Sequence, residues 1–397
     1  MNRYLTFLGF LGYLFIGTAA VLIPSVMPSI TETFMATGLT LAAIGLIFPA
    51  QSIGGIIGNL LAGIASDTMG RRWLVGLSAF LLGGALALVA GAGLWVLFVV
   101  GFVLVGTAQG ALSTGINAMI ADVNRGSRGR ALNALHGVYG VGAALSPLII
   151  GYFIDHGMPW RWALAGVGLI WLGYGLVVSL ARQESNAPQK QSSGPRLNLG
   201  MLRDRPFLML FLIAFIYNGV AVSLLGWIGV FMQRSGDVSN FFSLSMISVF
   251  YVALTTGRFL CALVVERLGY TTMMRLLALG LLLTYPLVLI GGETFLMVAG
   301  VFFIGLSFSG LFPTALAFGT RLYPEQAGTL SGTLGVGMTL GSMIPPVWTG
   351  IIADHWNFQV ALGVNYLLVV ALMGIVLYLG RLEGRSAEGQ PIAGTSG

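Results

Sequence analysis

The chain has 397 residues, of which 56% are hydrophobic and only 8% are charged. A soluble domain carries about 25% charged residues, so this composition excludes a soluble globular protein and predicts an integral membrane protein. The formal net charge is +6, and its distribution along the chain suggests membrane topology rather than binding to nucleic acid.

Charged residues are excluded from long blocks of the sequence. The 49 residues between Arg72 and Asp122 carry none, which is enough for two spanning helices of about 20 residues and a turn. The first uncharged run, residues 4–31, is longer than the apolar core of about 7–15 residues in a signal peptide, so we expect a retained first span. In chain order the predicted spans are 5–30, 39–66, 73–94, 96–121, 131–154, 161–181, 206–232, 239–265, 272–291, 294–320, 327–353 and 357–380.

Arginines between the predicted spans indicate the orientation. Lys and Arg favour the cytoplasmic side, and a cytoplasmic N-terminus leaves only Arg161 and Arg234 outside. The cytoplasmic set then comprises the cations of the polar stretch 183–205 together with Arg3, Arg71, Arg72, Arg125, Arg128, Arg130, Arg267, Arg275, Arg321, Arg381 and Arg385. Twelve spans return the C-terminus to the cytoplasm, so we expect a multi-pass protein of the cell membrane with both termini inside.

The longest polar segment between spans divides the chain near its middle. Residues 183–205 are rich in Pro, Ser, Gln and Gly and are typical of a cytoplasmic linker. We therefore expect two six-helix halves, residues 1–182 and 206–383, followed by a disordered tail at 384–397.

The two halves repeat one another at a constant offset of 199 residues. Matched residues include Gly58 with Gly257, Gly70 with Gly269, Gly142 with Gly341, Pro147 with Pro346, and Asp155-His156 with Asp354-His355. The duplicated Asp-His pair favours helix termination over proton relay. Glycines expected to permit close helix crossings are Gly137, Gly140, Gly142, Gly335, Gly337 and Gly341. Transporters commonly bind their substrate between such repeats, near the bilayer midplane.

A charged turn follows the second predicted span. The run from Gly63 to Arg72 has the form G-x-x-x-D-x-x-G-R-R and resembles the signature loop of the major facilitator superfamily. The resemblance implies twelve helices in two pseudo-symmetric halves and a conformational latch. The latch residues would be Asp67, Gly70, Arg71, Arg72, Glu266 of the degraded second copy, and Arg258. For Arg258, contact with the substrate is the alternative to a role in the latch. For the charged loop, the alternative is that its residues only anchor the membrane topology.

Residues 113–151 resemble a narrower group, the fucose and sodium-coupled glucose branch of the superfamily. The matching runs are Thr114 to Asn117 and Ala134 to Pro147, which implies that Asn117 and residues of the fifth span face a sugar. Members often carry an acid where this chain has Ser113, so symport with H⁺ or Na⁺ is in doubt. Facilitated diffusion, or coupling through His136 or Asp122, is the alternative. Pairing of Asp122 with Arg125, Arg128 or Arg130 is the simpler interpretation of that carboxylate.

Polar and aromatic side chains within the spans are the candidate substrate contacts. Gln109, Ser113 and Asn117 recur every four residues, so they share one helical face. Amides and aromatic rings suit the hydroxyls and C–H faces of a sugar, although helix packing is the alternative for each residue. The predicted contacts are Gln51, Gln109, Ser113, Asn117, His136, Tyr139, Tyr217, Asn218, Trp227, Tyr251 and Ser307.

These patterns favour a transporter of a small polar solute, most simply a monosaccharide, working by alternating access. A multidrug exporter of the same fold is the alternative. Three His and one Cys do not suggest an enzyme or a metal site, and no ATP-binding motif occurs. We expect no cofactor, no nucleic-acid partner, and a monomer in the lipid bilayer.

Overall fold

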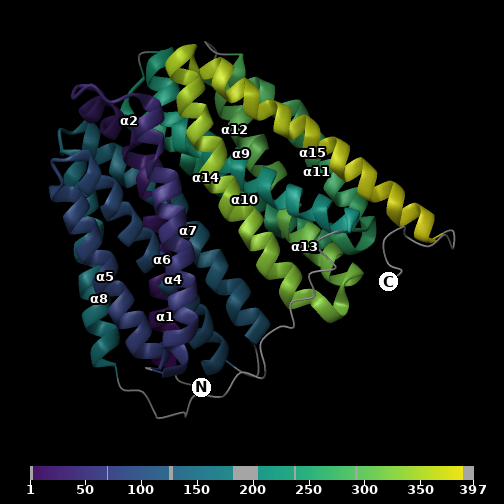
Figure 1. Ribbon diagram of the computed structural model, residues 1–397, viewed down its shortest axis with the longest axis horizontal. Coiled ribbons are helices and arrows are strands. Elements are labelled where there is room, and N and C mark those ends of the chain that lie inside the picture. The colour runs from purple at the N-terminus through teal and green to yellow at the C-terminus, as the bar shows by residue number, and fades with distance from the viewer. Residues whose placement is uncertain are drawn as a thin grey trace. The chain divides into compact units, whose positions relative to one another are not determined.

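The computed structural model describes residues 3–68, 70–124, 128–181, 204–236, 238–290 and 294–387. Throughout these ranges the regular structure is helical, and twelve segments are long and apolar enough to cross a membrane, which confirms the predicted all-α membrane fold. The helices, labelled in Figure 1, are α1 (Arg3–Ala20), α2 (Leu22–Met35), α3 (Leu41–Gly45), α4 (Ile47–Thr68), α5 (Arg71–Gly91), α6 (Trp95–Val123), α7 (Arg128–Asp155), α8 (Trp160–Leu180), α9 (Arg205–Ser235), α10 (Asn240–Leu268), α11 (Tyr270–Leu289), α12 (Thr294–Phe308), α13 (Leu311–Leu322), the short 3₁₀ helix η3 (Pro324–Gln326), α14 (Ala327–His355) and α15 (Phe358–Ala387).

Three of the predicted spans are broken into two helices. The breaks fall at Val21, at Leu46 and at Ser309–Gly310. Each lies three or four residues before a proline, namely Pro24, Pro49 or Pro313. Proline has no N–H to bond the carbonyl four residues earlier, and its ring collides with that carbonyl. The nearby proline therefore accounts for where each break falls, although Pro147 and Pro286 lie inside continuous helices. The prediction treated the three broken spans as continuous.

The chain forms two compact units. Unit 1 comprises Met1–Ser192 and Trp227–Tyr251, and unit 2 comprises Ser193–Gly226 and Val252–Gly397. Helices α9 and α10 therefore each contribute one part to each unit. The predicted linker lies almost wholly outside the described residues, as does the tail beyond residue 387.

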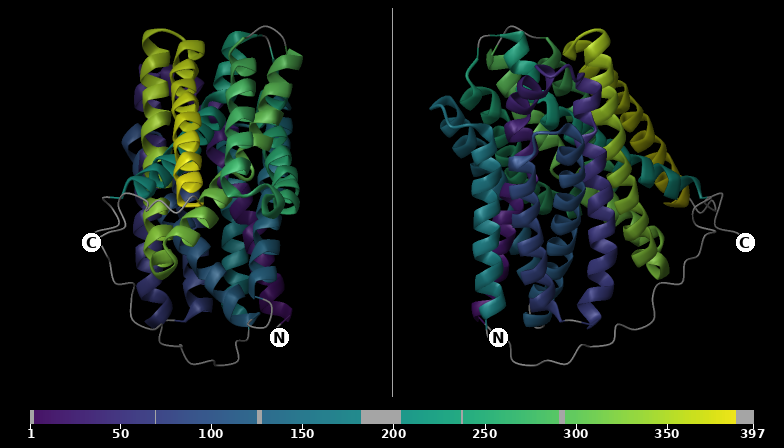
Figure 2. Two further views of the ribbon diagram at one scale, coloured as in Figure 1. Left: turned by 90° about the vertical axis from the view of Figure 1, so that its right-hand side faces the viewer. Right: turned by 60° about the vertical axis from the view of Figure 1, so that its left-hand side comes forward.

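Unit 1 is built around α6. This helix packs against α1, α4, α5 and α7, while α5 also packs along α8 and α1 along α7. Figure 2 shows these helices, purple to blue, running alongside one another. Phe98, Phe102 and Trp171 are fully buried in this unit.

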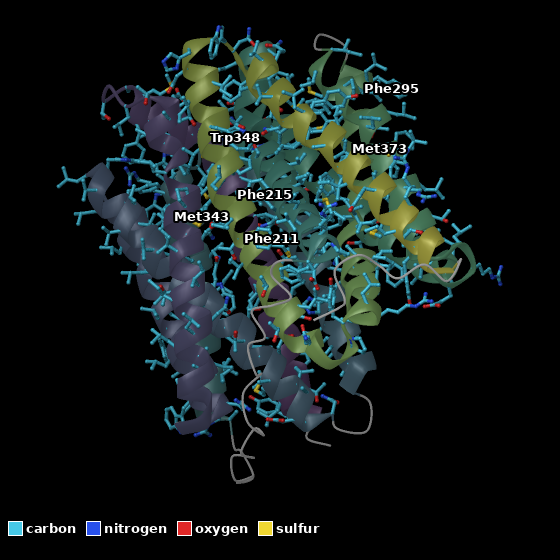
Figure 3. The ribbon with its side chains drawn as sticks, turned by 45° about the vertical axis from the view of Figure 1, so that its right-hand side comes forward. Phe211, Phe215, Phe295, Met343, Trp348 and Met373 are labelled. Atoms are coloured by element: carbon cyan, nitrogen blue, oxygen red, sulfur yellow. The ribbon has the colours of Figure 1, made fainter. Side chains whose placement is uncertain are left out.

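Unit 2 has α11 in a comparable position. It packs against α12, α13 and α15, and α14 packs along α15. Tyr285 and Phe308 are fully buried. Figure 3 labels Phe211 and Phe215 of α9 beside Met343 and Trp348 of α14, and backbone contacts confirm this pairing of helices.

The repeat is confirmed by matching glycine crossings. Gly142 of α7 lies against the Leu14 carbonyl and the Thr18 backbone nitrogen of α1. Its counterpart Gly341 of α14 lies against the Phe215 carbonyl and the Gly219 nitrogen of α9. Both crossings thus use residues four apart on the partner helix. Of the other glycines expected at close crossings, Gly337 contacts Phe211, whereas Gly137 and Gly335 face no described atom within 4 Å.

Two further features repeat at the same offset. Gly70 and Gly269 precede α5 and α11 with φ of 81° at both and ψ of 150° and 154°. The Nδ1 atoms of His156 and His355 each lie 2.8 Å from a carbonyl oxygen four residues earlier, that of Tyr152 and that of Ile351. The duplicated histidines therefore bind the last turn of α7 and α14, as the helix-termination interpretation predicted.

Candidate functional site

A polar cluster in unit 1 joins α1 to α6. Asn117 donates from Nδ2 to the Tyr13 hydroxyl and, at 2.9 Å, to the Ser113 carbonyl oxygen. The Tyr13 hydroxyl lies 3.2 Å from Ser113 Oγ, so Tyr13 accepts from the amide and can donate to the serine. Both nitrogen-bound hydrogens of Asn117 are thereby used, whereas its Oδ1 oxygen has no hydrogen-bond partner among the described residues.

Aromatic side chains from α7 and α10 extend this cluster. The His136 ring stands edge-on to Tyr13 with 5.3 Å between ring centroids, and Tyr139 lies 6.4 Å from Tyr13. Tyr251 meets Tyr139 at 6.5 Å. His136 is exposed, while Tyr139 and Tyr251 are half-buried. The structure therefore brings together five predicted residues from three helices, and we call them, with Tyr13, the Tyr13 cluster.

The predicted glutamines form a separate chain of hydrogen bonds. Gln51 of α4 donates to Gln109 Oε1 at 2.7 Å, and Gln109 donates to the Ala19 carbonyl at 3.1 Å. Both the oxygen and the nitrogen of the Gln109 amide are thus hydrogen-bonded, and these bonds join α4, α6 and α1. This is the packing role that was the alternative for each candidate.

In unit 2, Tyr217 lies among aromatic rings and close to a cation. Its ring centroid is 5.3 Å from that of Phe308 and 5.7 Å from that of Phe312. The Arg258 guanidinium lies close to its hydroxyl. The neighbouring Asn218 donates to the Met338 carbonyl of α14 at 2.8 Å.

Two predicted contacts are packed within their units. Trp227 is fully buried in unit 1, with its ring 6.0 Å from Phe48. The Ser307 hydroxyl donates to the Phe303 carbonyl at 2.8 Å and lies against Gly280 of α11. Neither side chain joins the Tyr13 cluster.

The signature loop carries an ion pair. Arg71 Nε lies 3.3 Å from Asp122 Oδ2, which joins the start of α5 to the end of α6. Arg72 donates to the Ala181 carbonyl at the end of α8, and its guanidinium stacks on Trp73. The structure thus shows Arg71 in the role expected of Arg125, Arg128 or Arg130, whose side chains lie outside the described part.

The remaining predicted latch residues are less fully described. The Asp67 side chain lies outside the described part of the chain. Glu266 is exposed two residues before the end of α10, and Arg258 lies eight residues before Glu266 on the same helix. A separation of eight residues is about 12 Å along a helix, too far for a direct pair between them.

A family model described as Major Facilitator Superfamily matches residues 7–332 and, in a second overlapping match, residues 239–394. The chain belongs to this superfamily. It is therefore a multi-pass membrane transporter and not an enzyme. In the part that the structure describes, no three His, Cys, Asp or Glu side chains are placed to hold a metal ion.

Several superfamily members resemble this chain over most of its length. The glucose/mannose transporter GlcP of Bacillus subtilis is 22% identical over 298 residues, covering 73% of this chain and 74% of its own. The hexuronate transporter of the same organism is 26% identical over 393 residues, covering 90% and 91%. Among solved structures, the nucleoside transporter NupG aligns with a TM-score of 0.76 at 13% identity, covering 94% of this chain and 99% of its own. A D-xylose–proton symporter aligns with a TM-score of 0.75 at 15% identity, covering 95% and 97%.

Tyr13 is the member of the cluster that the sequence analysis missed. It lies in a span without charge, and aromatic residues are ordinary in such spans. A signal was present, because Tyr13 is the one tyrosine inside the first predicted span, residues 5–30, where its hydroxyl requires a partner.

Proposed function

We propose that this protein carries a monosaccharide across the cell membrane by alternating access. The observation that supports this most is the Tyr13 cluster, in which an amide, a hydroxyl, an imidazole and three aromatic rings from four helices meet. Relatives named as glucose/mannose and hexuronate transporters agree with a sugar.

The chemistry of the Tyr13 cluster suits a sugar. Each sugar hydroxyl can donate and accept, and the Asn117 Oδ1 oxygen is an acceptor without a protein partner among the described residues. Tyr139 and Tyr251 offer ring faces to the C–H surface of a pyranose. The Tyr13 hydroxyl holds the Asn117 amide in one orientation, so less conformational freedom is lost when a solute binds.

The coupling ion and the topology belong to the same proposal. His136 supplies the one imidazole of the cluster, and histidine is the side-chain type best suited to exchange a proton under physiological conditions, so it is the candidate proton carrier and uniport is the alternative. Both termini lie in the cytoplasm and the protein works as a monomer. Asp67, Gly70, Arg71, Arg72 and Glu266 act as the latch between conformations.

Counterflow in proteoliposomes tests the sugar assignment, because exchange of labelled for unlabelled solute needs no coupling ion. We expect saturable exchange of D-glucose or D-xylose. Asn117→Ala should weaken it by about tenfold, since one or two hydrogen bonds to the solute are lost. Asn124→Ala is the matched control, because it removes an amide from the end of the same helix, where Asn124 pairs with Thr6 and Ile120.

Two outcomes would contradict the proposal. Exchange of lipophilic cations in place of any sugar would identify the alternative, a multidrug exporter. Sugar exchange that survives Asn117→Ala, Tyr139→Ala and Tyr251→Ala unchanged would place the sugar site elsewhere in the molecule.

A further inference from the structure

Arg258 lies deep within a membrane-spanning helix. It is about 15 Å from the end of α10 at Leu268 and about 27 Å from the start at Asn240, by helical rise. A charged side chain at such a depth is costly in contact with lipid and is expected to face protein, water or an opposite charge.

The side chain of Arg258 is exposed but does not share the lipid face of α10. The strongly exposed apolar residues Val252, Phe259, Leu260 and Leu263 gather within about 100° of one another around the helix. Arg258 lies about 100–160° from each of them, on the side where it meets Tyr217 of α9. Its guanidinium therefore faces a water-accessible surface of unit 2.

No carboxylate neutralises this cation in the described part of the chain. The ion pairs found there are Arg71 with Asp122 and Arg321 with Glu383. The described acidic side chains of unit 2 stand at or near helix ends, at Asp204, Glu266, Asp354 and Glu383. Tyr217 supplies one neutral acceptor, which leaves most of the five guanidinium N–H donors for another group.

We propose that Arg258 binds the carboxylate of the transported solute, so that the substrate class is a sugar acid rather than a neutral sugar; this rests on the proposed sugar transport. The planar guanidinium matches a carboxylate through two parallel hydrogen bonds. Tyr217 holds the guanidinium in place from the α9 side. One arginine balances the single charge of a carboxylate, whereas a phosphate monoester carries about two negative charges at neutral pH.

Counterflow with labelled D-glucuronate, D-glucose and glucose 6-phosphate tests this inference. We expect the wild type to exchange glucuronate with an apparent affinity at least about tenfold above that for glucose. Arg258→Gln should lose this preference while it keeps its exchange of glucose, which shows that the variant is folded. Arg258→Lys should retain part of the preference, because the positive charge remains but the two parallel N–H donors of the planar guanidinium are lost. Arg267→Gln removes an exposed arginine from the end of the same helix and should change neither affinity.

The outcomes separate this inference from the function on which it rests. Exchange of glucose without glucuronate, or glucuronate exchange that Arg258→Gln leaves intact, overturns the sugar-acid assignment and leaves sugar transport standing. Exchange of glucose 6-phosphate that depends on Arg258 overturns the choice of carboxylate over phosphate. Failure of all three sugars to exchange overturns sugar transport and the inference with it.

Discussion

Arg71 Nε lies 3.3 Å from Asp122 Oδ2, and the Asp122 side chain is 44% exposed. The pair connects the signature loop to the helix that carries Ser113 and Asn117. Because water reaches the carboxylate, its contribution to stability is small, and exposed pairs of this kind contribute about 0.2–1 kcal/mol.

We predict that Asp122→Asn leaves any proton-driven accumulation of solute intact. A carboxylate held by an arginine at a helix end is a structural partner and not the coupling group. Accumulation under an imposed pH gradient in proteoliposomes measures this directly. Arg71→Gln is the matched variant, and the two changes together should have no more effect on thermal stability than either alone. Loss of accumulation in Asp122→Asn with normal counterflow would instead identify Asp122 as the proton carrier.

Two glycines of α7 should respond oppositely to alanine. A Cβ at Gly142 would collide with the Leu14 carbonyl, and forcing apart a packed crossing costs about 1–3 kcal/mol. At Gly137 there is open space, and alanine favours a helix over glycine by up to about 1 kcal/mol. Thermal unfolding in detergent should therefore show a lower midpoint for Gly142→Ala and an unchanged or higher one for Gly137→Ala. Equal effects would refute the close crossing.

The turns before α5 and α11 should require glycine at positions 70 and 269. With φ of 81° and ψ of 150° and 154°, Gly70 and Gly269 adopt a backbone conformation that is essentially restricted to glycine. Gly70→Ala and Gly269→Ala should each cost about 1–3 kcal/mol, and asparagine should not rescue either, because the conformation lies outside the left-handed helical region. Gly84→Ala, within α5 and in open space, is the control for thermal unfolding.

A buried amide network joins α9, α14 and α15. Asn365 donates to Ser223 at 2.8 Å and to Thr349 at 2.9 Å, and it accepts from the indole of Trp348 at 2.7 Å. Asn365→Leu leaves the indole N–H without this partner, which should cost about 1–3 kcal/mol. Trp348→Phe, at the position labelled in Figure 3, removes that donor. In thermal unfolding the double variant should be less destabilised than the sum of the single variants, and strict additivity would contradict the network.

The sequence alone was sufficient to predict the membrane spans and the internal repeat. Apolar length predicted twelve crossings, and the offset of 199 residues predicted matching glycines and histidines, because both signals are local or periodic. The breaks were not predicted, since proline alone does not decide them. Pro147 and Pro286 lie inside continuous helices, whereas Pro24, Pro49 and Pro313 follow breaks.

The candidate site could be predicted only as a collection of residue types. The four-residue spacing of Gln109, Ser113 and Asn117 predicted one common face, and all three do bond toward α1. Which helix that face would meet depends on packing between distant segments. For the same reason, the sequence did not distinguish Gln109 and Ser307, which bond within the packed helices, from the residues of the Tyr13 cluster.

The proline breaks also affect how easily three of the spans can bend. An unbroken helix must stretch or lose a backbone hydrogen bond to flex sharply, and in hydrocarbon such a loss is costly. At Val21, Leu46 and Ser309–Gly310 the bond that proline cannot form is already missing. The first, second and tenth spans therefore have a compliant point at a fixed position, and the segments on either side can tilt independently while each stays intact.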